Sequence, residues 1–266
     1  MIYALENVSK CYPSVTALDG VSFAVRPGEQ LAVLGPSGSG KSTLFRLLNA
    51  TLRPSSGSLS FDGGDTSTMS ANTLRAMRRR TATIYQQHNL VPSLTALENT
   101  LTGALGRWSI WHTLRNSVSP DREDTERATH ALELVSLADK RHTRASELSG
   151  GQQQRVAIAR ALMQSPDVIL ADEPIASLDP ELSRSILDLL VRVASDSKRT
   201  LIVALHSVEL AKECMPRLVA LQQGRVFFDA APPDVARDQW NCLYAIAPAR
   251  DPHTPDSIPR RKPRCS

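Results

Sequence analysis

The feature that most constrains the fold of this chain is a glycine-rich segment, GPSGSGKST, at residues 35–43. It follows the apolar run QLAVL and precedes the leucine-containing run LFRLLNA, so it is expected to connect a buried strand to a helix. The spacing of Gly35, Gly40, Lys41 and Ser42 fits the pattern G-x-x-x-x-G-K-[ST]. The alternative is a simple glycine turn that matches the pattern by chance. The predicted flanking strand and helix make such a chance match less frequent.

A loop of this composition predicts a phosphate-binding site. Glycine lets successive backbone N–H groups point inward at phosphate oxygens, and the following helix adds its positive N-terminal end. We expect Lys41 to reach the β- and γ-phosphates and the Ser42 hydroxyl to ligate Mg²⁺. The residues predicted to hold the nucleotide here are Gly35, Pro36, Ser37, Gly38, Ser39, Gly40, Lys41, Ser42 and Thr43.

Two adjacent carboxylates indicate which reaction the bound phosphate undergoes. Asp172 and Glu173 end the apolar run of VILADEP. Neighbouring carboxylates repel each other at a strand end, so their presence there indicates a function. Asp172 can hold Mg²⁺ through water, and Glu173 can orient or deprotonate an attacking water. This favours hydrolysis over phosphoryl transfer to an acceptor. The alternative is an ordinary acidic loop after a strand.

The remaining pattern predicts an α/β fold with an antiparallel N-terminal part. Residues 1–30 alternate apolar and polar positions and contain the turn RPGE, which indicates antiparallel strands. Short apolar runs typical of a buried parallel sheet occur at 30–34, 167–171 and 200–205. The segment RLVALQQGRVFFDA is expected to form a closing hairpin that turns at Gly224.

Helical patterns alternate with these strands. Residues 179–195 are expected to form a helix with Asp179 as N-cap and Pro180 at its first position. Between about 87 and 165 strand signals vanish, which predicts a helical subdomain inserted into the core. We therefore divide the chain into a main domain at 1–247 and a basic, proline-rich tail at 248–266 that is expected to be disordered.

Charge and hydropathy exclude several classes of protein. Much of the net charge of +4 comes from the tail at 248–266, so the main domain is close to neutral and nucleic acid is not an expected partner. The basic run RAMRRR at 75–80 is expected to be the solvated face of a short helix. No apolar run approaches the roughly 20 residues that a membrane helix needs, and no signal peptide is visible.

A further segment, LSGGQQQRVAIARAL at 148–162, resembles the signature segment of ATP-binding cassette (ABC) ATPases, and it precedes the acidic strand as it does in that family. Read without the family, it predicts a Ser-Gly-Gly start of a helix, which can also bind an anion. The resemblance implies an ABC ATPase core that binds ATP with Mg²⁺. The matching residues, which would act on the ATP of a partner subunit, are Leu148, Ser149, Gly150, Gly151 and Gln152.

The same resemblance implies roles for four more residues. Tyr12 matches the aromatic that stacks on adenine, and the alternative is a strand tyrosine packed at a sheet edge. Gln86, chosen over its neighbour Gln87, matches the glutamine that contacts Mg²⁺ and water. Asp179 matches the aspartate of the dimer loop, in addition to capping a helix. His206 matches the switch histidine that contacts the γ-phosphate, so the implied catalytic set is Glu173, His206, Gln86 and Lys41, and the implied metal set is Ser42, Gln86 and Asp172.

The resemblance also implies partners. If one subunit's phosphate loop and the other's signature segment grip the same γ-phosphate, the site is complete only in a homodimer with ATP between the chains. Such ATPases sit on the cytoplasmic face of the membrane, bound to permease subunits, and an extracytoplasmic binding protein delivers the solute. IYQQHNLV, GALGRWSIW and LVALQQGRVFFDA are most similar to ATPase subunits of bacterial phosphonate importers. Phosphate esters, phosphite or an amino acid are alternative solutes, and a non-transport ABC ATPase or a soluble phosphotransferase is a more distant alternative.

Overall fold

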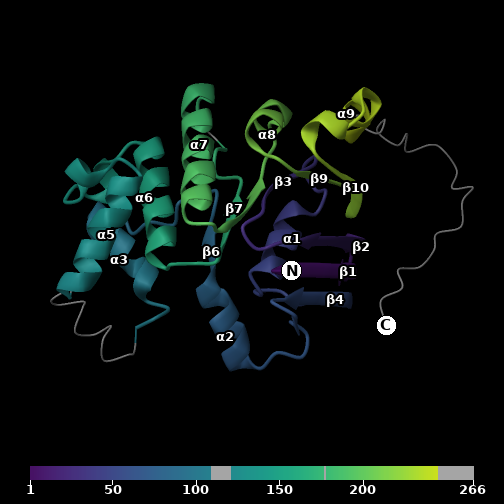
Figure 1. The fold of residues 1–266 in the computed structure, drawn as a ribbon, viewed down its shortest axis with the longest axis horizontal. Coiled ribbons are helices and arrows are strands. Elements are labelled where there is room, and N and C mark those ends of the chain that lie inside the picture. The colour runs from purple at the N-terminus through teal and green to yellow at the C-terminus, as the bar shows by residue number, and fades with distance from the viewer. Residues whose placement is uncertain (109–120, 177, 245–266) are drawn as a thin grey trace, which may run out of the picture.

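Two β-sheets organise the chain (Figure 1). The computed structural model describes residues 1–108, 121–176 and 178–244. In the smaller, antiparallel sheet the order is β2-β1-β4-β5, with β1 (Tyr3–Tyr12), β2 (Val15–Val25), β4 (Ser56–Phe61) and β5 (Gly64–Asp65). In the larger sheet the order is β10-β9-β3-β8-β7-β6, with β3 (Gln30–Leu34), β6 (Thr81–Ile84), β7 (Val168–Asp172), β8 (Thr200–Ala204), β9 (Leu218–Gln222) and β10 (Arg225–Ala230).

The larger sheet is parallel except at one edge. Strands β6, β7, β8, β3 and β9 pair in parallel, and β10 pairs antiparallel with β9 through a turn at Gly224, whose φ is 79°. The predicted strand at 30–34, the predicted closing hairpin and the antiparallel strands within residues 1–30 are confirmed. The strand predicted at 167–171 is also confirmed, with a shift of one residue to Val168–Asp172. Because the parallel strands end at the same edge, their following loops meet there.

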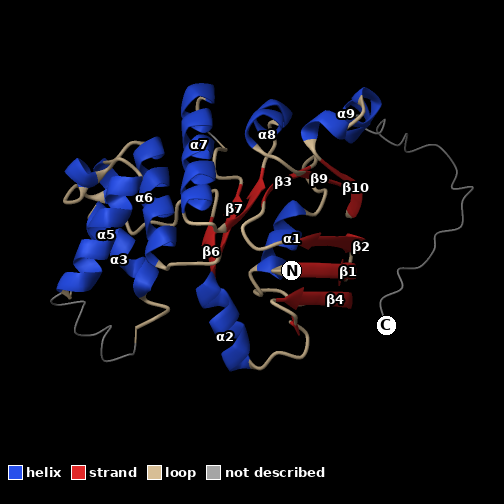
Figure 2. Cartoon of the chain, viewed as in Figure 1, coloured by secondary structure: helices blue, strands red, loops and turns tan. Residues whose placement is uncertain are grey.

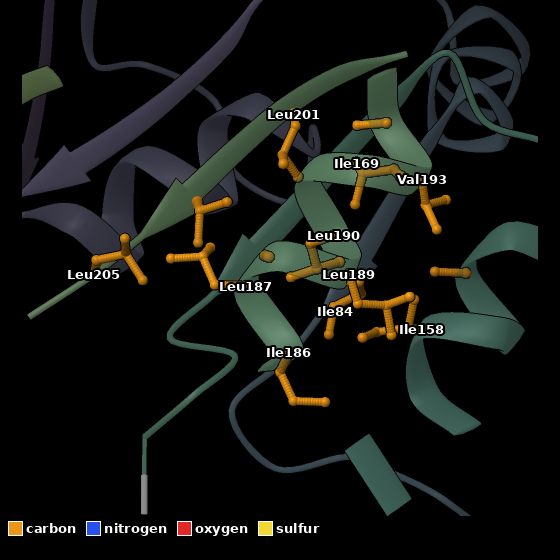
Figure 3. Close-up of a cluster of buried hydrophobic side chains, with 14 of the residues drawn as sticks. Ile84, Ile158, Ile169, Ile186, Leu187, Leu189, Leu190, Val193, Leu201 and Leu205 are labelled. Atoms are coloured by element: carbon orange, nitrogen blue, oxygen red, sulfur yellow. The ribbon is translucent and has the colours of Figure 1, made fainter. Parts of the chain in front are cut away.

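Alternating side chains of the large sheet are buried on its two opposite faces. In β7, Val168 and Leu170 join a core with the antiparallel sheet and helices α1 (Lys41–Leu48) and α2 (Ala71–Arg80). Ile169 and Ala171 point to the other face, which is covered by α6 (Gly150–Met163), α7 (Pro180–Asp196), α8 (Val208–Cys214) and α9 (Arg237–Tyr244). Figure 3 shows the second face, where side chains of α7 meet those of β7 and β8.

Between β6 and β7 the chain leaves the sheet and forms a helical part, seen beside α7 in Figure 2. Its named elements are all helices, namely α3 (Ala96–Leu101), η1 (Thr102–Ala104), α5 (Arg122–Leu134), η2 (Ala138–Lys140), η3 (Ala145–Glu147) and α6. A small apolar cluster of Leu101, Ala104, Ala128 and Met163 holds α3, α5 and α6 together. The predicted α/β class, with an antiparallel N-terminal sheet and a helical insertion, is confirmed.

Local signals set the helix boundaries. Asp179 caps α7 by accepting a hydrogen bond from the Leu182 N–H at 2.9 Å, with Pro180 at the first helical position, as predicted. The basic run at 75–80 lies on α2, as expected. Helix α9 was not predicted. The predicted tail at 248–266 lies outside the described residues. Among the helices of the described part, none is long and apolar enough to cross a bilayer.

Candidate functional site

The glycine-rich loop joins β3 to α1 through backbone conformations that favour glycine. Gly35, Gly38 and Gly40 have φ values of 148°, 78° and 105°. A Cβ atom at Gly35 would lie 2.2 Å from the Leu221 carbonyl oxygen, and one at Gly40 would lie 2.5 Å from the Ala17 carbonyl oxygen. Neighbouring strands therefore hold the loop so closely that no side chain fits at these two positions.

Lys41, the first residue of α1, is 5% exposed and folds back over the loop. Its Nζ donates hydrogen bonds to the carbonyl oxygens of Gly35 at 2.7 Å and Pro36 at 3.3 Å, and it lies 4.0 Å from Glu173 Oε1. Burial lowers the pKa of Lys41, while the carboxylates of Glu173 and Asp172 act in the opposite direction. A cationic donor is thus held inside the loop, where phosphate oxygens would be stronger acceptors than the two carbonyl groups.

The two predicted carboxylates and the predicted histidine lie together at the carboxyl edge of the sheet. Strands β7 and β8 pair in parallel with Asp172 opposite Ala204, so Glu173 and His206 follow neighbouring strand ends. Glu173 adopts a φ of 52°, and its Oε1 lies 2.6 Å from His206 Nε2. His206 is 44% exposed and Glu173 only 18%. Lys41, Glu173 and His206 therefore form one connected cluster, with the histidine on its solvent side.

Asp172 provides the test of whether the site fits Mg²⁺. Its Oδ1 is buried without a hydrogen-bond partner, and its pKa is raised by burial and then by Glu173, while Lys41 and His206 oppose the shift. Leaving a buried carboxylate oxygen without a donor costs free energy, which a cation would offset. Ser42 exposes its hydroxyl in the first turn of α1. These hard oxygen ligands are the type that Mg²⁺ prefers, so the residues fit the ion.

Gln86 lies on the loop after β6, with an exposed side chain. Because β6 pairs in parallel with β7 and Ile84 lies opposite Ala171, this loop leaves the sheet at the same edge as Glu173. No hydrogen bond links Gln86 to the cluster within the described residues. It lines a cavity of about 590 Å³ together with Gln87 and Gly150, between the core and the helical part.

The signature segment forms the N-terminus of α6. Ser149 Oγ accepts a hydrogen bond from the Gln152 N–H at 3.3 Å, and Gln152 Oε1 accepts one from the Ser149 N–H at 3.0 Å. The two glycines differ in their surroundings. A Cβ at Gly151 would lie 2.5 Å from Leu182 Cδ2, whereas at Gly150 the nearest atom is Leu178 Cδ2 at 4.0 Å. Gly151 packs closely on the Leu182 side chain of the same chain, and Gly150 faces open space.

The signature segment and the phosphate loop do not meet within one chain. Figure 1 shows α6 separated from α1 by the strands and α7. Among residues 1–108, 121–176 and 178–244, no hydrogen bond or ion pair joins the segment at 148–152 to Lys41, Glu173 or His206. Asp179, at the start of α7, lies on the signature side, because Gly151 packs on Leu182 of that helix.

Tyr12 ends β1 and is half-buried. The Lys10 ammonium lies 5.8 Å from the centre of its ring. The hairpin that follows Tyr12 leads into β2, whose Ala17 carbonyl borders Gly40. Tyr12 is therefore on the hairpin beside the phosphate loop, and the structure shows no bond from it to that loop in the described part of the chain.

One further residue touches this site and is not predicted from the sequence. Tyr244, the last residue of α9, donates a hydrogen bond from its hydroxyl to the His206 carbonyl oxygen at 3.3 Å. Trp240, Leu243 and Tyr244 have the spacing of one helix face, and this was the available signal.

Three comparisons with known proteins agree. The sequence profile of the family described as "ABC transporter" matches residues 18–176. The chain is 44% identical over 243 residues to the phosphonates import ATP-binding protein PhnC of Hydrogenovibrio crunogenus, covering 91% of this chain and 88% of that protein. It is also 44% identical over 259 residues to the phosphite import ATP-binding protein PxtA of Stutzerimonas stutzeri, covering 96% and 92%. The dimeric ATP-binding cassette MJ0796, solved with ADP and Pi, is 32% identical with a TM-score of 0.75, covering 86% of this chain and 98% of that one.

Proposed function

This chain belongs to the ABC transporter family, and we propose that it is the ATP-hydrolysing subunit of an import system, working as a homodimer on a separate permease. The observation that carries the proposal is the cluster in which Lys41 lies 2.7 Å from the Gly35 carbonyl and Glu173 lies 2.6 Å from His206. The cluster combines a cation that can bind phosphate, the Lys41 ammonium, with a carboxylate that can accept a proton. A structural loop needs neither.

In the proposed reaction, the loop amides and Lys41 bind the β- and γ-phosphates of ATP. Glu173 Oε1 is held by His206, which leaves Oε2 to accept a proton from water. The oxygen of that water bonds to the γ-phosphorus, the bond to the β–γ bridging oxygen breaks, and ADP and phosphate leave. We assign His206 a contact to the γ-phosphate, because its ring is both exposed and oriented by Glu173. Tyr12 is assigned to the adenine ring.

Ser42 and Asp172 are the residues that would hold Mg²⁺, and Gln86 is the third proposed ligand. The ion would neutralise the charge that develops on the phosphate oxygens. The buried Asp172 Oδ1, which has no hydrogen-bond partner, supports this assignment. Asp172 itself then positions the ion and leaves proton transfer to Glu173.

The separation of the two anion-binding elements supports the proposed homodimer. The signature residues Leu148, Ser149, Gly150, Gly151 and Gln152 lie away from the chain's own phosphate loop, and the exposed Ser149 and Gly150 form an open helix start. Such a start attracts an anion through its N–H groups and helix dipole. We propose that it grips the γ-phosphate held by a second copy, with Asp179 at the junction. Binding of ATP would then close the dimer, and hydrolysis would open it.

The permease is proposed to contact the cavity of about 810 Å³ between α2, β6 and the helical part. Tyr85 and Leu105 line this cavity and are among the exposed large apolar side chains of the described residues. The loop after Tyr85 carries Gln86, so a partner seated here would sense the nucleotide site. We therefore propose that the chain works at the cytoplasmic face of the membrane, with an extracytoplasmic binding protein as the source of solute.

We propose a phosphonate as the solute. The support is the PhnC relative at 44% identity, and the similarly close PxtA relative makes phosphite the second candidate. Both are phosphorus oxyanions, and none of the ATP-site residues described above would contact either one. The test is growth of a strain deleted for this gene on methylphosphonate or phosphite as sole phosphorus source. We expect the native chain, but not Lys41→Ala, to restore growth on methylphosphonate and not on phosphite. Restored growth on phosphite alone would make phosphite the assigned solute.

A further inference from the structure

Helix α9 is fastened to the body of the protein near the nucleotide site. Trp240 packs edge-on against Phe228 of β10 with ring centres 5.3 Å apart, and the Lys212 ammonium lies 3.9 Å from the centre of its ring. Gln222 Nε2 donates a hydrogen bond to the Cys242 carbonyl at 2.8 Å, and Leu243 is fully buried. These contacts fix both the lateral position and the C-terminal end of the helix.

The fastening delivers the hydroxyl of Tyr244 to the loop after β8. It donates a hydrogen bond to the His206 carbonyl at 3.3 Å. Burial raises the pKa of Tyr244, with Glu209 adding to the shift and Gly35 opposing it, so the hydroxyl keeps its proton at neutral pH. The phenol therefore ties helix α9, which is anchored on β9 and β10, to the loop after β8.

The residue that Tyr244 holds carries a group of the proposed site. The ring of His206 makes the 2.6 Å contact with Glu173, whose Oε1 also lies 4.0 Å from the Lys41 ammonium. Fixing the His206 backbone therefore fixes the histidine relative to the carboxylate and the lysine. Errors of about 1 Å in such an arrangement are costly to catalysis.

We propose that Tyr244 is a positioning residue for ATP hydrolysis, whose hydroxyl anchors the His206 loop to helix α9 and so holds the His206 ring against Glu173. The inference rests on the proposed ATPase function. It assigns to α9, which lies outside the residues matched by the family profile, a part in the chemical step.

The alternative is that the Tyr244 hydroxyl only adds stability, and Tyr3 provides the matched control. Tyr3 is fully buried, and its hydroxyl also donates to a backbone carbonyl, that of Leu48, at 2.8 Å. It touches neither loop of the site. The Tyr3 hydroxyl also lies 3.3 Å from Thr81 Oγ1, so Tyr3→Phe removes at least as much hydrogen bonding as Tyr244→Phe, at a place distant from the proposed chemistry.

The experiment measures single-turnover and steady-state ATP hydrolysis by the purified full chain for the native protein, Tyr244→Phe, Tyr3→Phe and Lys41→Ala, with melting temperatures. We expect Tyr244→Phe to lower kcat about three- to tenfold, the size expected for loss of one hydrogen bond, with KM for ATP unchanged. Tyr3→Phe should lower the melting temperature and leave kcat unchanged. A kcat for Tyr244→Phe within twofold of native, or a change in KM alone, would overturn the inference.

Trp240→Leu provides an independent arm, because it loosens α9 without touching either loop. If α9 acts by delivering the hydroxyl, Trp240→Leu lowers kcat, and adding Tyr244→Phe to it causes no further loss. Fully multiplicative losses would overturn the inference. If the native chain shows no ATP hydrolysis that is lost in Lys41→Ala, the proposed function itself is refuted. Failure of the inference and failure of the proposed function are therefore distinguishable.

Discussion

His206 Nε2 lies 2.6 Å from Glu173 Oε1, although 33 residues separate them in the sequence. Sheet topology accounts for this, because β7 and β8 are parallel neighbours and both residues lie just beyond the strand ends. The contact ties the proposed water-activating carboxylate to the ring assigned to the γ-phosphate. A change at either residue is therefore expected to affect the chemical step more than nucleotide binding.

Glu173→Gln tests the assignment of the general base. The amide keeps the size of the side chain and cannot accept the proton of water at neutral pH, so hydrolysis should stop while ATP binding persists. Because uncleaved ATP stays between the subunits, a stable dimer is expected with saturating Mg-ATP, measured by size-exclusion chromatography.

The control for this variant is Glu126→Gln, in which the glutamate lies on the exposed surface of α5 and pairs with Arg122. It should hydrolyse ATP at the native rate and show no trapped dimer. A monomeric Glu173→Gln protein in Mg-ATP would contradict the shared-nucleotide arrangement.

Lys41→Ala tests the phosphate loop. The substitution removes the ammonium that lies against Gly35 and Glu173, and we expect turnover to fall by about two orders of magnitude or more, as for loss of a charge-stabilising group. Lys140→Ala, at an exposed position of η2, should retain native turnover. Phosphate release assays on both proteins, with circular dichroism to verify folding, make the comparison, and equal turnover would refute the assignment.

The sequence predicted the parts of the site that depend on local rules. The glycine spacing of 35–43, the strand ending at Asp172 and the capping of α7 by Asp179 follow from backbone sterics, hydropathy and helix capping, and the structure has them. The roles of Gln86 and of the signature residues 148–152 depended on the family resemblance, because local rules predict a helix start at Ser149 but no contact with a partner's ATP, and they give Gln86 no role.

Contacts made by distant segments were not predictable in this way. Tyr244 lies on a short helix whose place depends on Trp240 meeting Phe228 and Lys212, which is a tertiary arrangement. Strand β6 was missed because TATI is only four residues long, too short for a clear strand pattern. Its identity as a strand depends on pairing with β7, which the sequence does not encode locally.

Gly150→Ala and Gly151→Ala separate binding from packing in the signature segment. At Gly151 the added methyl would meet Leu182 Cδ2 at 2.5 Å, so we expect a loss of about 1–3 kcal/mol of stability. At Gly150 the nearest atom is 4.0 Å away, so the melting temperature should stay close to native. ATP turnover should nevertheless fall at Gly150, because the methyl occupies the face proposed to meet the partner's γ-phosphate. Native turnover by a folded Gly150→Ala protein would contradict that role.

Asp172→Asn tests the metal assignment through stability as well as activity. The buried Oδ1 of Asp172 has no hydrogen-bond partner, and a neutral amide is cheaper to bury than a carboxylate. In EDTA without nucleotide the variant should therefore be at least as stable as the native chain, by up to about 1 kcal/mol. With ATP, replacing EDTA by Mg²⁺ should raise the melting temperature of the native chain and have a much smaller effect on the variant, because only the carboxylate attracts the ion strongly. Asp139→Asn, exposed in η2, should respond to Mg²⁺ like the native chain. An equal response of the Asp172 variant and the native chain would remove Asp172 from the proposed metal site.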